Sequence, residues 1–191
     1  DRFKCDFIYW INTELLSSSV NKIYKRGLIT ELYPENMSFG EDLVFVLNYL
    51  KHCNRISFTQ EPLYQHEVYN SVSLTHSFSP ARFSNLEDIQ KAILDFADDK
   101  NKINPRIYDK YVKDALHLTR MWYKNKNVPY IRKKEIIGEW LKQSYIRKLK
   151  ISDYQLHWKD RMLLHCLHMS CFIGINLIVN GKEYINSLSK E

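Results

Sequence analysis

Two adjacent carboxylates, Glu41 and Asp42, are the residues whose types and position are best suited to chemistry. They follow Gly40 and open the run LVFVLNYLKHC, whose apolar residues recur at helical spacing. A carboxylate in the first turn of a helix is kept anionic by the helix dipole and by backbone N–H groups. Asp42 is therefore a candidate general base. The alternative is structural, because acidic residues are enriched in first turns for stability alone.

The histidines lack the spacing of a self-contained metal site. They contain no HExxH pattern and no other pair at metal-binding helical spacing. We therefore expect no complete metal site from the histidines, which are His52, His66, His76, His117, His157, His165 and His168.

The carboxylate pair needs a scaffold, and the first 80 residues predict a mixture of helices and strands. Phe3, Phe7, Ile11 and Leu15 lie at i, i+4 spacing on one face of an opening helix. A second helix starts near Gly40. Short alternating or apolar runs predict strands, separated by turn residues, at 20–24, 56–59 and 63–66.

The remaining residues predict helices only. Pro80, Pro105 and Pro129 each stand where a first-turn proline would open a helix. Trp122 and Trp140 lie at core spacing in the second and third of these helices. A fourth helix is predicted over residues 152–181, with a glycine as its C-terminal cap.

Charge also divides the chain. The 191 residues carry a net charge of +6 and are 45% apolar, which excludes disordered and collagen-like classes. Residues 1–80 hold 7 basic and 9 acidic groups (net −2), and residues 81–191 hold 21 and 13 (net +8). Four cysteines without a CxxC pair favour a reducing compartment. We therefore expect two regions with different roles, 1–80 and 81–191, in a cytoplasmic protein.

The basic surplus has three interpretations. It fits anionic lipid headgroups, nucleic acid or a solvated surface, and no motif supports nucleic acid. The next segment, residues 162–181, has no charged side chain and is long enough to span a bilayer. Its polar residues favour a core helix or one lying at the membrane interface. The basic residues in question are Arg132, Lys133, Lys134, Lys142, Arg147, Lys148 and Lys150.

Three separated tracts resemble a known family. They are SSSVNKIYKRGLI, PENMSFGEDLVFVLNYLKHCNRI and PLYQHEVYNSVSLTHSF, within residues 17–80. Their order and spacing are similar to the second half of the catalytic domain of bacterial family 2 glycosyltransferases, which has a "WNKLYRRELI"-like tract, a "GED" opening a helix, and "LYYYR" and "NSIT"-like tracts.

The resemblance implies a fold, a reaction and a cofactor. The fold would be α/β to α+β, the second half of a GT-A domain followed by a mainly α-helical C-terminal region. The reaction would be inverting transfer from a nucleotide-sugar donor, with Asp42 as base and Glu41 beside it on the acceptor side. A divalent cation, Mg²⁺ or Mn²⁺, would neutralise the leaving diphosphate. The acceptor would be a saccharide or lipid-linked saccharide of a bacterial surface polysaccharide, such as a capsule or exopolysaccharide.

Further site residues follow from the same resemblance. Lys22 would meet phosphate charge and Asn21 would line the site, although each also fits a simple strand or turn role. Tyr64 is a candidate for stacking on sugars. His66 and His76 are possible third metal ligands. The sequence departs from the family at Ser19 and Val20, and at His66 and Glu67, which puts acceptor contacts in doubt.

The strands that bind the nucleotide, and their Asp-x-Asp metal motif, would lie upstream of residue 1. We therefore expect residues 1–80 to be the acceptor-side half of the catalytic domain, inactive without its upstream half. The alternative is a non-catalytic helical interaction or membrane-apposition module that retains part of the fold. Expected partners are donor, acceptor, the inner face of the cytoplasmic membrane and a second copy paired through an open sheet edge.

Overall fold

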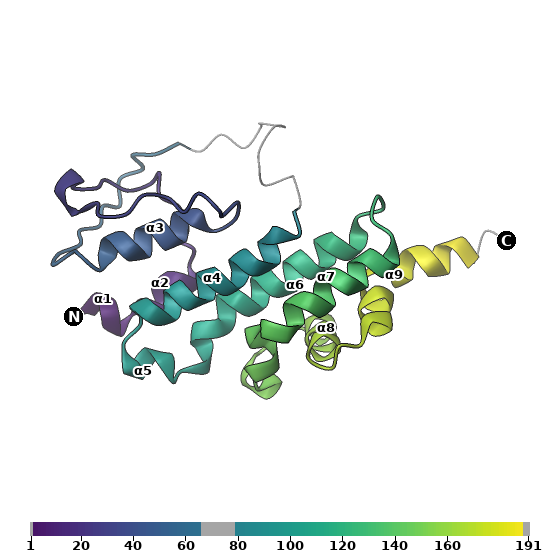
Figure 1. Ribbon diagram of the computed structural model, residues 1–191. Coiled ribbons are helices and arrows are strands. Elements are labelled where there is room, and N and C mark those ends of the chain that lie inside the picture. The colour runs from purple at the N-terminus through teal and green to yellow at the C-terminus, as the bar shows by residue number, and fades with distance from the viewer. Residues whose placement is uncertain (1, 66–78, 189–191) are drawn as a thin grey trace. The chain divides into compact units, whose positions relative to one another are not determined.

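The computed structural model describes residues 2–65 and 79–188, and these residues form helices and no strand (Figure 1). The chain forms two compact units, Asp1–Ile107 and Tyr108–Glu191. The predicted boundary at residue 80 concerns functional regions and stays a prediction.

The first unit is organised around two long helices that pack on each other, α3 (Glu41–Leu50) and α4 (Ala81–Phe96). Leu43 and Leu47 of α3 and Phe83 and Leu86 of α4 are each about 1% exposed or less. The shorter elements of this unit are α1 (Arg2–Cys5), α2 (Phe7–Asn12), the 3₁₀ turn η1 (Arg26–Leu28) and α5 (Asp99–Lys102).

The second unit is a helical bundle centred on α6 (Asp109–Lys124). This helix contacts α7 (Tyr130–Gln143), α8 (Trp158–His168) and α9 (Phe172–Leu188). Its buried face includes Ala115 and Leu118, and Trp122 is 3% exposed. The remaining elements of this unit are the 3₁₀ turns η4 (Tyr145–Lys148) and η5 (Ile151–Asp153). The 3₁₀ turn η3 (Pro105–Tyr108) begins in the first unit and leads into α6.

Local start signals predicted most of the long helices correctly. Gly40, Pro80 and Pro129 are the N-caps of α3, α4 and α7, and the Ser79 hydroxyl accepts a hydrogen bond of 3.3 Å from the Ala81 amide. Pro105 opens η3 directly before α6. The core positions of Trp122 and Trp140, which are 3% and 6% exposed, are also confirmed.

The predicted α/β to α+β fold, a GT-A half with a sheet, is wrong for the described residues, because the segments expected to be strands are not paired. Ile23 is 96% exposed, Phe58 62% and Leu63 72%. A strand needs a neighbour to satisfy its backbone hydrogen bonds, and these short runs have none here. Position 66, the end of the third expected strand, lies outside the described residues.

Two expected helices are broken. The opening pattern divides into α1 and α2, which ends at Asn12, and Leu15 is 44% exposed. The helix expected over residues 152–181 becomes η5, α8 and α9. The break between α8 and α9 contains Ser170, whose φ of 53° is left-handed and incompatible with a continuous helix.

Residues 162–181, which include no Asp, Glu, Lys or Arg, have both fully buried and exposed apolar side chains. Leu163, Leu164, Leu167 and Ile175 are fully buried. Met169 and Ile173 are 74% and 69% exposed. Among the helices of the described residues, none has the length and hydropathy that crossing a bilayer requires.

Candidate functional site

The candidate site begins with the backbone at Gly40, which places α3. Gly40 has a φ of 76°, a left-handed conformation that favours glycine. A β-carbon at this position would lie 2.6 Å from Cγ1 of Ile89 on α4, and still closer to Cδ1. The missing side chain therefore lets the start of α3 approach α4 closely, with Glu41 and Asp42 in its first turn.

The Asp42 side chain is held by Ser19, which lies 23 positions earlier in the chain. The Ser19 hydroxyl donates a 2.6 Å hydrogen bond to Oδ1 of Asp42. Ser19 is 4% exposed, and its own carbonyl accepts a 3.0 Å hydrogen bond from the Tyr24 hydroxyl. Among the described residues, Oδ2 of Asp42 has no hydrogen-bond partner. One carboxylate oxygen is therefore oriented and the other is available to accept a proton.

Lys22 supplies a positive charge beside this carboxylate. Its ammonium group donates to the carbonyls of Leu15, at 2.7 Å, and Ser18, and to Oδ1 of Asn21 at 2.7 Å. Burial lowers the pKa of Lys22 from 10.5 to about 8, and attraction to the Asp42 carboxylate opposes this shift. The ammonium is thus held by backbone and amide oxygens while it interacts electrostatically with Asp42.

Aromatic rings close the side of the site next to α3. Tyr24 packs edge-on against Phe45 and Tyr49, with ring centroids 5.3 and 4.9 Å apart. Burial raises the pKa of Tyr24, and the nearby Tyr33, Asp42 and Tyr49 add to the effect. The Tyr49 hydroxyl also accepts a 2.8 Å hydrogen bond from the Lys25 amide. These contacts fix the 19–25 segment against α3 although it has no regular structure at Ser19 and Lys22.

We call Ser19, Asn21, Lys22, Tyr24 and Asp42 the Asp42 cluster. Three of its members, Asn21, Lys22 and Asp42, were candidates from the sequence. Glu41 is half-buried at the first position of α3, next to the cluster along the chain.

The remaining candidates from the sequence are Tyr64, His66 and His76. Tyr64 is 49% exposed near the end of the described segment. His66 and His76 lie outside the described residues, so the expectation about a third metal ligand stays a prediction.

Sequence reasoning missed the roles of Ser19 and Tyr24. Ser19 stood out only as a departure from the family pattern, and nothing in its spacing predicts a hydrogen bond across 23 positions of the chain. Tyr24 was read as a strand residue.

The divalent cation that the resemblance implies finds no donor set here. No three His, Cys, Asp or Glu side chains in the described residues are grouped so that they could hold a metal ion.

Comparison with known proteins provides no information about the Asp42 cluster. No protein-family model, no curated protein and no solved structure matches the chain.

Proposed function

We propose that this chain is part of a glycosyltransferase, on the acceptor side of the active site, with Asp42 as the general base. The observation that carries the proposal is the hydrogen bond between Ser19 and Asp42. It joins two of the three tracts that resemble family 2 glycosyltransferases, which are separated in the sequence. The proposal rests on this cluster and not on the sheet that the resemblance implied.

The cluster has the parts that proton removal from a hydroxyl requires. Ser19 holds Oδ1 of Asp42, which leaves Oδ2 to accept the proton of an acceptor hydroxyl. The acceptor oxygen then forms a bond to the anomeric carbon while the bond to the nucleoside diphosphate breaks, so the configuration inverts. The nucleoside diphosphate leaves with the bonding electrons and Asp42 keeps the proton. The Lys22 ammonium interacts electrostatically with the Asp42 carboxylate.

The proposed substrates follow from the resemblance. The donor is a nucleotide sugar. The acceptor is a saccharide or lipid-linked saccharide used in bacterial surface polysaccharide synthesis. Peripheral attachment to the inner face of the cytoplasmic membrane would bring the enzyme to such an acceptor, and the basic residues of the second unit suit it.

The test is the substitution Asp42→Asn in the full-length gene product. Sugar transfer is measured from labelled nucleotide sugars to saccharide and lipid-linked saccharide acceptors. Loss of a general base lowers the rate by about 10² to 10⁴-fold. Asp88→Asn is the matched control, because Asp88 is an exposed carboxylate on α4 and makes the same chemical change outside the cluster. Equal activity of the wild type and Asp42→Asn, with both folded, would contradict the proposal.

A non-catalytic interaction module is the second candidate function. The observation that favours it is the helical second unit, whose segment from Arg120 to Arg161 holds 12 basic and 4 acidic residues. The same assay separates the two candidate functions. If the chain is a non-catalytic module, the full-length gene product has no transferase activity that depends on Asp42.

A further inference from the structure

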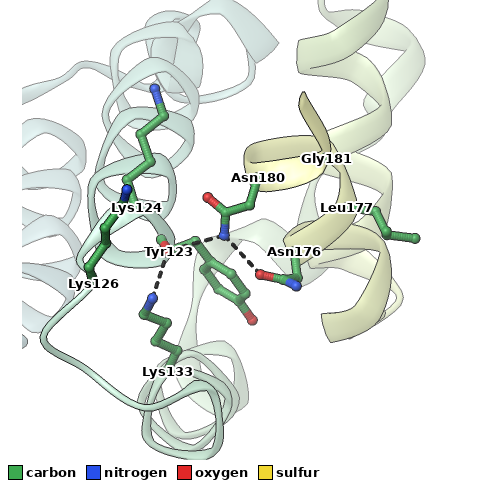
Figure 2. A pocket seen from close by; sticks show the side chains of 8 residues that line it. All are labelled: Tyr123, Lys124, Lys126, Lys133, Asn176, Leu177, Asn180 and Gly181. Atoms are coloured by element: carbon green, nitrogen blue, oxygen red, sulfur yellow. Dashed lines mark hydrogen bonds between the residues drawn. The ribbon is translucent and has the colours of Figure 1, made fainter. Parts of the chain in front are cut away.

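The second unit contains a cavity of about 500 Å³ lined by α6, α9 and the lysines at the end of α6 and the start of α7 (Figure 2). Its volume falls within the range of about 300 to 1,000 Å³ that is usual for small-molecule sites. Among the side chains that the structure describes, three lysines line the cavity and no acidic residue does. The lining residues are Tyr123, Lys124, Lys126, Lys133, Asn176, Leu177, Asn180 and Gly181.

Lys133 is a buried cation that has no counter-ion among the described residues. The residue is 8% exposed, and its ammonium group donates a 2.7 Å hydrogen bond to the carbonyl oxygen of Tyr123. Within the described part of the chain it has no ion pair and no other hydrogen-bond acceptor for its ammonium group. Burial lowers the pKa of Lys133, as expected for a charge that lacks a partner. Two of its three N–H donors thus remain available to an anion.

Tyr123 adds a second unsatisfied polar group. The residue is 1% exposed, and its hydroxyl has no hydrogen-bond partner in the described structure. A buried hydroxyl without a partner is unfavourable by about 1 to 3 kcal/mol. Figure 2 shows the ring of Tyr123 between Lys133 and Asn176. The hydroxyl has almost no accessible surface, so a ligand in the cavity does not reach it.

The polar groups of the cavity are held in place. The Asn180 amide donates to the Tyr123 carbonyl at 3.2 Å and to Oδ1 of Asn176 at 2.9 Å. Lys133 and Asn180 therefore converge on one carbonyl at the end of α6 from two different helices (Figure 2). Groups fixed in this way lose little conformational entropy when a ligand binds.

We propose that this cavity binds the phosphate group of a phosphorylated small molecule or lipid headgroup. A phosphate carries up to two negative charges and several acceptor oxygens, which suit the available N–H donors of Lys133 and the positive charge of the three lysines that line the cavity. The volume beyond the phosphate takes the organic part of the ligand, for which Leu177 supplies an apolar wall. This site lies within the second unit and its chemistry is independent of Asp42.

Isothermal titration calorimetry with inorganic pyrophosphate, at constant ionic strength, tests the proposal on the full chain. Lys133→Met and Lys124→Gln are each expected to weaken binding about tenfold or more, because each removes one charge-assisted contact. Lys113→Gln is the matched control, since Lys113 is exposed on α6 and does not line the cavity. An equal effect of Lys113→Gln and Lys124→Gln would overturn the proposal, as would no binding to the wild type.

A vesicle arm identifies the source of the phosphate. Flotation is compared for vesicles of phosphatidic acid in phosphatidylcholine and vesicles of phosphatidylcholine alone. Binding to phosphatidic acid that is lost in Lys133→Met and displaced by pyrophosphate supports a headgroup. Pyrophosphate binding without flotation supports a soluble phosphorylated molecule. Binding of neither probe overturns the proposal.

Discussion

At the scale of single residues, the Asp42 cluster depends on a short hydrogen bond between a buried serine and a partly buried carboxylate. Ser19 is 4% exposed and lies 2.6 Å from Oδ1 of Asp42. Hydrogen bonds to charged groups stabilise proteins more than neutral ones, because removing one partner leaves the charge without compensation. The cluster should therefore contribute to the stability of the first unit as well as to its chemistry.

Ser19→Ala should lower the free energy of unfolding by about 1 to 2 kcal/mol. The substitution removes the donor to Asp42 and leaves the rest of the cluster in place. Urea unfolding followed by circular dichroism measures the change. Ser17→Ala is the control, because Ser17 makes a 2.6 Å hydrogen bond to Oε2 of Glu14 in an exposed position, where such a bond contributes little. Equal effects of the two substitutions would show that the Ser19 contact is not special.

Lys22 should make stability depend on pH in a defined direction. Its pKa falls from 10.5 to about 8 on folding, so the unfolded chain holds more protons between these values. Below about pH 8 the buried Lys22 is charged, and its desolvation lowers the free energy of unfolding by the full amount. Above about pH 8 the folded chain loses this proton, so the free energy of unfolding rises with pH. Above pH 10 the raised pKa of Tyr24 acts in the opposite sense.

The measurement is urea unfolding of wild type and Lys22→Met between about pH 8 and pH 10. Stability of the wild type relative to Lys22→Met should rise across this range. Lys25→Met is the control, because Lys25 is exposed. A flat difference between wild type and Lys22→Met would mean that Lys22 is not desolvated.

At the scale of elements, the contact between α3 and α4 depends on Gly40. Gly40→Ala should lower the free energy of unfolding by about 2 to 4 kcal/mol, because it combines left-handed backbone strain with a clash against Ile89. Chemical denaturation measures the loss. Gly27→Ala is the control and should change little, since a β-carbon there meets nothing within 4 Å.

A second substitution isolates the clash. Ile89→Val shortens the side chain that a β-carbon at Gly40 would meet. The double variant should therefore be less destabilised than the sum of the two single changes. Strict additivity would show that the clash is relieved in another way.

Elements with local start signals could be predicted from the sequence, and elements that depend on partners could not. Gly40, Pro80 and Pro129 predicted helix starts because glycine and proline act on the backbone where they stand. A strand has to be completed by a distant segment, so the alternation at 20–24 did not decide its structure. The break at Ser170 was not predicted, because a run without charged residues indicates a helix but does not indicate where the helix ends.

The Asp42 cluster and the basic cavity differ in how much of each could be predicted from the sequence. Asp42 was found because a carboxylate in the first turn of a helix is suited to act as a base, and Asn21 and Lys22 were found because they lie within a tract that resembles a family. Lys133 appeared only as one of many basic residues. Its relation to Tyr123 and Asn180 comes from three helices packing together, which no local pattern encodes.

At the scale of the whole molecule, the chain carries its proposed chemistry and its positive charge in different units. The Asp42 cluster lies in Asp1–Ile107, and the basic cavity lies in Tyr108–Glu191. A transferase that acts on a lipid-linked acceptor would use the two properties together, with the cluster for proton removal and the basic unit for an anionic partner. The proposed function therefore requires that Asp42 takes part in the chemical step.

The most direct measurement is the separate determination of kcat and KM for sugar transfer by the full-length gene product and its Asp42→Asn variant. A general base acts in the transition state, so kcat should fall by about 10² to 10⁴-fold while the KM for the acceptor changes little. Circular dichroism should show that the variant is folded. A folded Asp42→Asn enzyme with unchanged kcat, or with only a raised KM, would contradict the role of Asp42 as base.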